Sequence, residues 1–144
     1  MVPVRGAHAG LHCCAARPFS RMCRAQPDIL SFDAHQGLEL FFSNPESTAF
    51  ARKGGTVAYG LIPTLQDLST VRAEHLFTRW LTLAALAGDP QQFAQNSMIT
   101  ASCGLGLLSP ESVTKSFQLA RSVGTLIRAL ADDQLVAASE SAGS

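Results

Sequence analysis

The sequence has few charged residues and no excess of either sign. Asp, Glu, Lys and Arg make up 15% of the 144 residues, and eleven basic side chains balance eleven acidic ones. A charge-rich disordered chain is excluded, because 47% of this chain is hydrophobic. The balanced charge gives no support to binding of nucleic acid or of an anionic membrane, since both are attracted by a strong positive field.

Long apolar runs are also missing. The longest, Leu81 to Ala87, contains Thr82 and ends at Gly88, far short of the roughly 20 residues that span a membrane. No continuous apolar segment precedes His12, which argues against a secretory signal peptide. A cytoplasmic location is therefore expected. In that reducing setting, cysteines act as metal ligands, catalytic groups or core residues more often than as disulfides.

Three common nucleotide-binding and catalytic motifs are absent from the sequence. The segment 104–106 (GLG) lacks the third glycine of a dinucleotide-binding loop and the Gly-Lys-Ser/Thr ending of a phosphate-binding loop. No Gly-x-Ser-x-Gly nucleophile elbow occurs anywhere in the chain. The sequence therefore indicates neither a nucleotide cofactor nor a serine hydrolase.

Short apolar runs alternate with segments of helical periodicity along the chain. This alternation predicts βα units, and hence an α/β domain with a parallel sheet. The predicted strands are residues 9–15, 28–33, 56–62 and 97–102, and the predicted helices begin at Pro18, Asn44, Ser69 and Ser109. The third of these helices extends to Ala87, where a glycine and a proline end it.

The last predicted helix is followed by a segment of low complexity. A stripe with helical spacing is expected to face the core. Its members are Val113, Phe117, Ala120, Gly124, Ile127 and Ala131. Ala, Ser, Glu and Gly dominate the end of the chain, which predicts a domain over residues 1–131 and a flexible tail over residues 132–144.

Groups able to carry chemistry stand at the ends of the predicted strands. His12 and Cys14 close the first strand, Asp33 closes the second, and Cys103 follows the fourth. Parallel sheets bind their ligands beyond the carboxyl ends of the strands. His12 and Cys14 are two residues apart, so both side chains point to the same face. One imidazole, two thiolates and one carboxylate form a set of zinc ligands.

Each of these residues also has a plainer interpretation. Cysteine is often an inert core residue, and an Asp at a strand end is often a turn residue or a helix cap. Cys13 is expected to point to the opposite face from Cys14, and Cys23 to pack within a helical stretch. The positions of four candidate ligands at the ends of three adjacent strands strengthen the metal-site interpretation, and the plainer interpretations stay open beside it.

Four segments together resemble the family of cobalamin-independent methionine synthases and their relatives. Residues 55–64 (GTVAYGLIPT) are similar to the penultimate strand of that family, and residues 99–109 (ITASCGLGLLS) to its last strand and the cysteine turn that follows. Residues 11–14 (LHCC) resemble its His-x-Cys strand, and residues 30–33 (LSFD) its acid-ending strand. The matches run in order along the chain, and the Ser-Cys-Gly-Leu-Gly turn is the most specific.

The resemblance implies a TIM barrel and a zinc site. Matched one by one, the ligands of that family fall on His12, Cys14, Asp33 and Cys103. The zinc would hold a homocysteine-type thiol as a thiolate, which attacks the methyl group of a folate-type donor. A related branch alkylates coenzyme M at the same kind of site. Asp33 departs from the pattern, since methionine synthases proper have Glu at that position. The resemblance assigns no catalytic residue beyond the metal site.

Length limits what the resemblance covers. A complete (β/α)8 barrel needs about 250 residues. This sequence therefore corresponds to about the last four βα units, the C-terminal half of such a barrel. Open sheet edges then predict self-association or a complementing N-terminal half. Two alternatives remain open: a non-catalytic or truncated half-barrel that binds zinc or a partner, and a zinc-free barrel of the uroporphyrinogen decarboxylase type.

Overall fold

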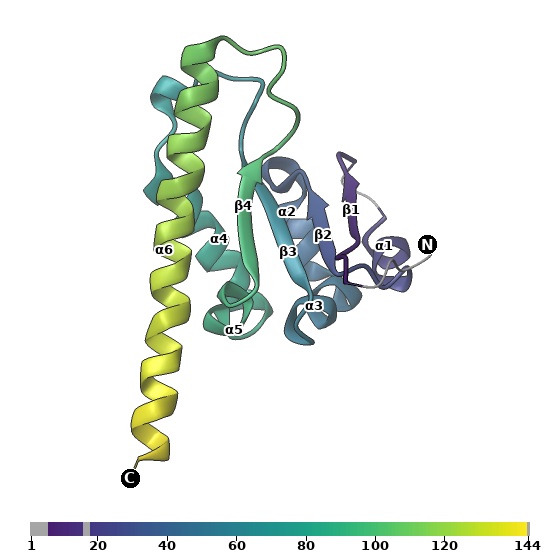
Figure 1. Cartoon of the computed structure of the whole chain (residues 1–144), viewed down its shortest axis with the longest axis vertical. Helices are drawn as coiled ribbons and strands as arrows, with labels where there is room; N and C mark the ends of the chain where they lie inside the picture. The colour runs from purple at the N-terminus through teal and green to yellow at the C-terminus, as the bar shows by residue number, and fades with distance from the viewer. Residues whose placement is uncertain (1–5, 16–17, 144) are drawn as a thin grey trace.

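The computed structural model describes residues 6–15 and 18–143, and the side chains of these residues except 134–138. It shows four strands and the helices that alternate with them (Figure 1). The strands are β1 (Gly10–Cys13), β2 (Ile29–Phe32), β3 (Thr56–Ile62) and β4 (Ser97–Ala101). The helices are α1 (Phe19–Arg24), α2 (Ala34–Ser43), α3 (Pro45–Arg52), the 3-10 turn η1 (Leu68–Thr70), α4 (Ala73–Ala87), α5 (Pro90–Ala94) and α6 (Pro110–Ala142).

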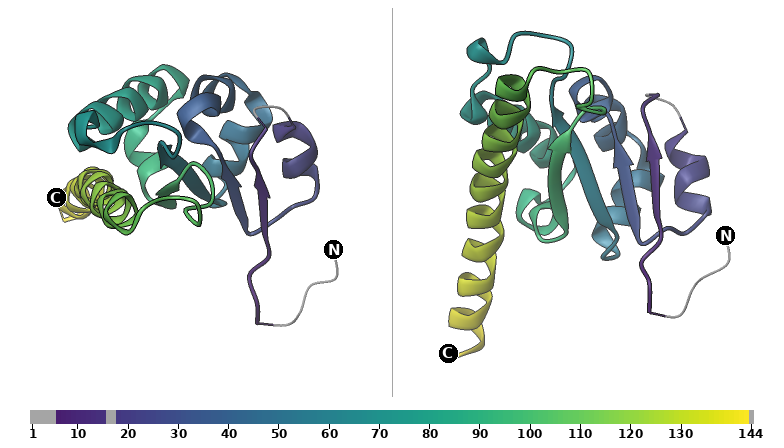
Figure 2. Two further views of the ribbon diagram at one scale, coloured as in Figure 1. Left: turned by 90° about the horizontal axis from the view of Figure 1, so that it is seen from above. Right: turned by 45° about the horizontal axis from the view of Figure 1, so that its top comes forward.

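The four strands form one parallel sheet in the order β1-β2-β3-β4. The predicted α/β class and parallel sheet are thus confirmed. The helices lie on one side of the sheet, and we call the other side the open face (Figure 2). The pairing register places His12 beside Ser31 and Ala58 beside Met98. None of the described helices is both long and apolar enough to cross a membrane.

The core lies between the sheet and its helices. Alternate strand residues point to the helices, and Leu30, Phe32, Val57 and Tyr59 are accordingly buried. Aromatic rings fill much of this space. Phe32 stacks on Phe41 of α2 with ring centroids 4.9 Å apart. These contacts fix α2 and α4 against the middle of the sheet, because such rings bury large apolar areas.

Side-chain caps set where several helices begin. Asn44 accepts hydrogen bonds from the backbone amides at the start of α3, and Ser109 does the same for α6. Both helices carry proline in their first turn, as predicted. The predicted third helix starts later than expected, because Val71 is extended and separates η1 from α4. Helices α2 and α5 were not predicted from the sequence.

Helix α6 differs from the prediction in length and in orientation. It continues to Ala142, although residues 132–144 are predicted to be a tail; residue 144 lies outside the described part of the chain. No glycine or proline interrupts residues 125–142, and alanine favours the helix. The predicted stripe is buried at Ile127 and Ala131, but the prediction was wrong for Phe117, which is 65% exposed. Leu119 and Val123 are buried instead, where the helix packs on β4, α4 and α5.

Candidate functional site

His12 and Cys14 meet at the carboxyl end of β1, on the open face. The two residues are exposed, and His12 Nε2 lies 3.1 Å from Cys14 Sγ. His12 Nδ1 lies 2.8 Å from the hydroxyl of Ser31 on the neighbouring strand. Ser31 thereby holds the imidazole ring in one orientation. The prediction that His12 and Cys14 share a face is confirmed by this contact.

Cys103 reaches the same place from the other edge of the sheet. Its thiol lies near the thiol of Cys14, and hydrogen bonding between the two raises the pKa of Cys14. Slight desolvation of the exposed Cys14 thiol and the nearby negative charges of Cys103, Cys13 and Asp33 raise that pKa further. Residues 89 positions apart in the sequence therefore lie near one another. Cys103 is exposed, so the paired thiols are accessible to solvent.

A buried hydroxyl pair anchors the loop that carries Cys103. The Thr64 and Ser102 hydroxyls lie 3.3 Å apart and are buried. The Ser102 amide also donates to the Ile62 carbonyl at 2.8 Å. Together these bonds tie the loop after β4 to the end of β3. The backbone immediately before Cys103 is therefore fixed.

Asp33 follows β2 and serves as the N-cap of α2. Its Oδ1 accepts a hydrogen bond from the Gln36 amide at 3.2 Å. The interpretation of Asp33 as a helix cap is therefore confirmed. Its carboxylate is also close enough to disfavour the negative charge of a Cys14 thiolate. Asp33 thus contributes charge to the site, while one of its oxygens is committed to the helix.

The donor atoms can be compared with what zinc requires. Zinc–nitrogen and zinc–sulfur bonds of about 2.0 and 2.3 Å at a tetrahedral angle place the two ligand atoms about 3.5 Å apart. The observed separation between His12 Nε2 and Cys14 Sγ is 3.1 Å. Among the described residues, however, no three His, Cys, Asp or Glu side chains are grouped around one point that could hold an ion. Instead, the imidazole of His12 hydrogen-bonds to Cys14, and the thiol of Cys103 lies near the same Cys14 thiol.

The remaining cysteines pack as expected. Cys13 and Cys23 are half-buried against the hydrophobic core. Burial raises the pKa of Cys23, as does the nearby charge of Glu46. Sequence reasoning missed Ser31 and the Thr64–Ser102 pair, because both depend on which strand residues lie side by side. The polar Ser31 between Leu30 and Phe32 was the only local signal.

Comparison of the chain with models of known protein families, with curated proteins and with solved structures finds no match.

Proposed function

We propose that the carboxyl edge of this sheet binds zinc through His12, Cys14 and Cys103 and supports methyl transfer to a thiol substrate. The observation that carries this proposal is the position of Cys14, whose thiol is 3.1 Å from His12 Nε2 and lies near the thiol of Cys103. Imidazole nitrogen and thiolate sulfur are the donors that zinc prefers. Three protein ligands leave a fourth position for a substrate, as catalytic zinc sites require.

Each residue of the chain has a defined part in this function. Bound zinc supplies a positive charge that lowers the pKa of a substrate thiol, so that a nucleophilic thiolate exists at neutral pH. Ser31 is a positioning residue: when His12 Nδ1–H donates to the Ser31 hydroxyl, the lone pair of Nε2 is directed at the site. The exposure of Cys14 and Cys103 leaves room for a small thiol to approach.

The acceptor and the donor follow from the sequence resemblance. We propose a homocysteine-type thiol as acceptor and a folate-type compound as methyl donor. The consecutive parallel strand order is the order found within a (β/α)8 barrel, and it supports treating the chain as four of its βα units. A reducing compartment such as the cytoplasm would keep the exposed thiols available. The alternative is a half-barrel that binds zinc without turnover.

The test measures zinc and activity separately. Purified chain, dialysed after zinc loading, is expected to retain about one zinc ion per chain by mass spectrometry or atomic absorption. His12→Ala and Cys103→Ala should lose it, and Cys13→Ala, which removes a thiol on the helix side, should keep it. Ser31→Ala should bind zinc about 10- to 100-fold more weakly.

Two results would contradict the proposal in different ways. Substoichiometric zinc in the native chain, or retention of zinc by both ligand variants, would exclude the metal site. Stoichiometric zinc without methyl transfer from a folate donor to homocysteine would exclude the enzyme and support the alternative of a non-catalytic zinc-binding half-barrel.

A further inference from the structure

Each edge of the sheet, in the part of the chain that the structure describes, has backbone groups that point away from the neighbouring strand. Within the described residues, β1 and β4 each pair with one neighbouring strand (Figure 1). The Asn96 carbonyl and the Ser102 amide bond to β3. Because bonding direction alternates along a parallel strand, the backbone groups of Ser97, Ile99 and Ala101 point away from the sheet. Such an edge is a template for another strand.

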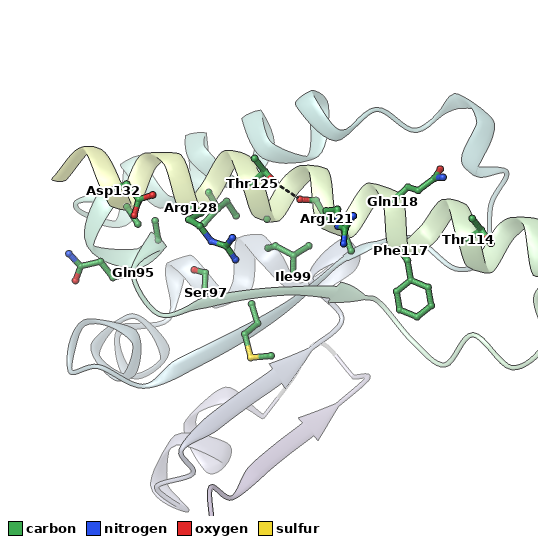
Figure 3. A pocket seen from close by; sticks show the side chains of 16 residues that line it. Gln95, Ser97, Ile99, Thr114, Phe117, Gln118, Arg121, Thr125, Arg128 and Asp132 are labelled. Atoms are coloured by element: carbon green, nitrogen blue, oxygen red, sulfur yellow. Dashed lines mark hydrogen bonds between the residues drawn. The ribbon is translucent and has the colours of Figure 1, made fainter. Parts of the chain in front are cut away.

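A groove of about 1280 Å³ runs along this edge between β4 and α6, and both apolar and polar side chains line it (Figure 3). Phe117 of α6, which is 65% exposed, lines the groove, and Met98, which is 48% exposed, lies on the β4 edge beside it. Ile99 lies on the strand side of the groove, facing the helix (Figure 3). Large apolar side chains exposed together mark contact surfaces. The groove therefore adds an apolar contact to the hydrogen bonds that the edge of β4 offers.

The opposite edge supplies matching surface. The Ala9 carbonyl accepts from the Ile29 amide on β2, so the alternation points the backbone groups of Gly10 away from the sheet. Leu11 and Cys13, on the helix side of β1, are only half-buried. The edge of β1 thus offers both hydrogen bonds and apolar side chains, as the edge of β4 does.

The solvent-accessible surface of the chain is larger than that of a typical folded monomer of the same mass, as expected if an interface is left uncovered. The chain exposes 8661 Å². A folded monomer of 15.3 kDa exposes about 7,100 Å², so the excess is about 1,500 Å² per chain. Part of it belongs to the end of α6 that extends beyond the sheet (Figure 1). Even half of the excess, about 750 Å², is close to the roughly 800 Å² that each partner buries in a standard interface.

We propose that two copies of this chain associate head to tail, with β4 of each copy pairing with β1 of the other. A two-fold axis parallel to the strands keeps all strands parallel and makes the two contacts identical. The result is a closed sheet of eight parallel strands, the number in a (β/α)8 barrel, with no open edge. The groove of each copy is then covered by the β1 edge of the other copy. This assembly requires no zinc and does not depend on the proposed function.

The test uses one variant for each edge. Light scattering is expected to give twice the chain mass of 15.3 kDa for the native chain over a range of concentrations. Phe117→Glu places a charge in the groove, and Gly10→Pro removes an outward-pointing amide, so each should give a folded monomer. Leu86→Glu is the matched control, because Leu86 is 81% exposed on α4 and lies outside the groove. It should remain dimeric.

Mixing the two edge variants distinguishes the head-to-tail arrangement from other dimers. A mixed pair retains one intact β4–β1 contact, so Phe117→Glu and Gly10→Pro should form a heterodimer that neither forms alone. Circular dichroism checks that each variant is folded, and Gly10→Lys replaces the proline variant if that one unfolds. A folded native monomer would overturn the proposal. So would a Gly10→Pro dimer, because such a dimer would form without the edge of β1.

Discussion

Replacement of Gly60 by alanine should strongly destabilise the fold beneath the candidate site. Gly60 lies where the pairing between β3 and β4 shifts register. A Cβ atom there would stand 2.7 Å from the Phe32 carbonyl oxygen and 2.9 Å from both the Ala101 oxygen and the Ser102 Cα. All three neighbours are backbone atoms of adjoining segments, so β2 and β4 would have to move apart. Overpacking of this kind costs about 1–3 kcal/mol, and we expect the upper part of that range.

The assay is urea unfolding followed by circular dichroism. Gly60→Ala should lower the midpoint without changing the slope, and should lower the melting temperature by about 6–10 °C. Gly124→Ala is the control, because nothing lies within 4 Å of its added Cβ on α6. That variant should gain about 0.5–1 kcal/mol from its higher helix propensity. A free energy of unfolding for Gly60→Ala within about 0.5 kcal/mol of the native value would refute the reasoning.

Two further predictions concern an ion pair and the paired thiols. Partial burial opposes ionisation of Glu39, but hydrogen bonds from Arg79, at 2.8 Å and 3.0 Å, and its charge outweigh burial and hold the pKa of Glu39 below 4.5. Glu39→Gln should therefore cost about 0.5–1 kcal/mol at pH 7. This difference should shrink as the pH falls through the lowered pKa of Glu39, because the protonated carboxyl is neutral like the amide of Gln. A pH-independent difference in urea unfolding would contradict this. Diamide, which accepts two electrons and two protons, should oxidise Cys14 and Cys103 of one chain to a disulfide. Peptide mapping should detect this disulfide, and detection of other cysteine pairs alone would contradict the proximity of the two thiols.

Local sequence patterns predicted the strands well because their signals are short-range. The strand at residues 56–62 has the predicted bounds, since glycines precede it and Pro63 follows it. Helix α3 begins where Asn44 and Pro45 predicted it. The orientation of α6 was not predictable in the same way. Phe117 and Leu119 both fit a helical spacing of apolar residues. Which of the two is buried depends on how α6 packs on β4 and its neighbouring helices.

The candidate site was predicted by residue type but not by partner. Alternation along β1 was enough to place His12 and Cys14 on one face. The proximity of Cys14 to Cys103 depends on how the sheet curves and where the last loop turns, which no local pattern encodes. Ser31 was missed for the same reason, because its position beside His12 is set by strand register. The Asp33 side chain caps the N-terminus of α2, so one of its oxygens is already hydrogen-bonded to the helix.

X-ray absorption at the zinc edge identifies the atoms bound to the metal, and therefore tests directly whether His12, Cys14 and Cys103 hold zinc. For the zinc-loaded and dialysed chain, we expect sulfur neighbours at about 2.3 Å and a nitrogen neighbour at about 2.0 Å. Cys103→Ala and His12→Ala, which should not retain the ion, should lack this spectrum. A spectrum with only oxygen and nitrogen neighbours, unchanged in both variants, would contradict the assignment of His12, Cys14 and Cys103 as the zinc site.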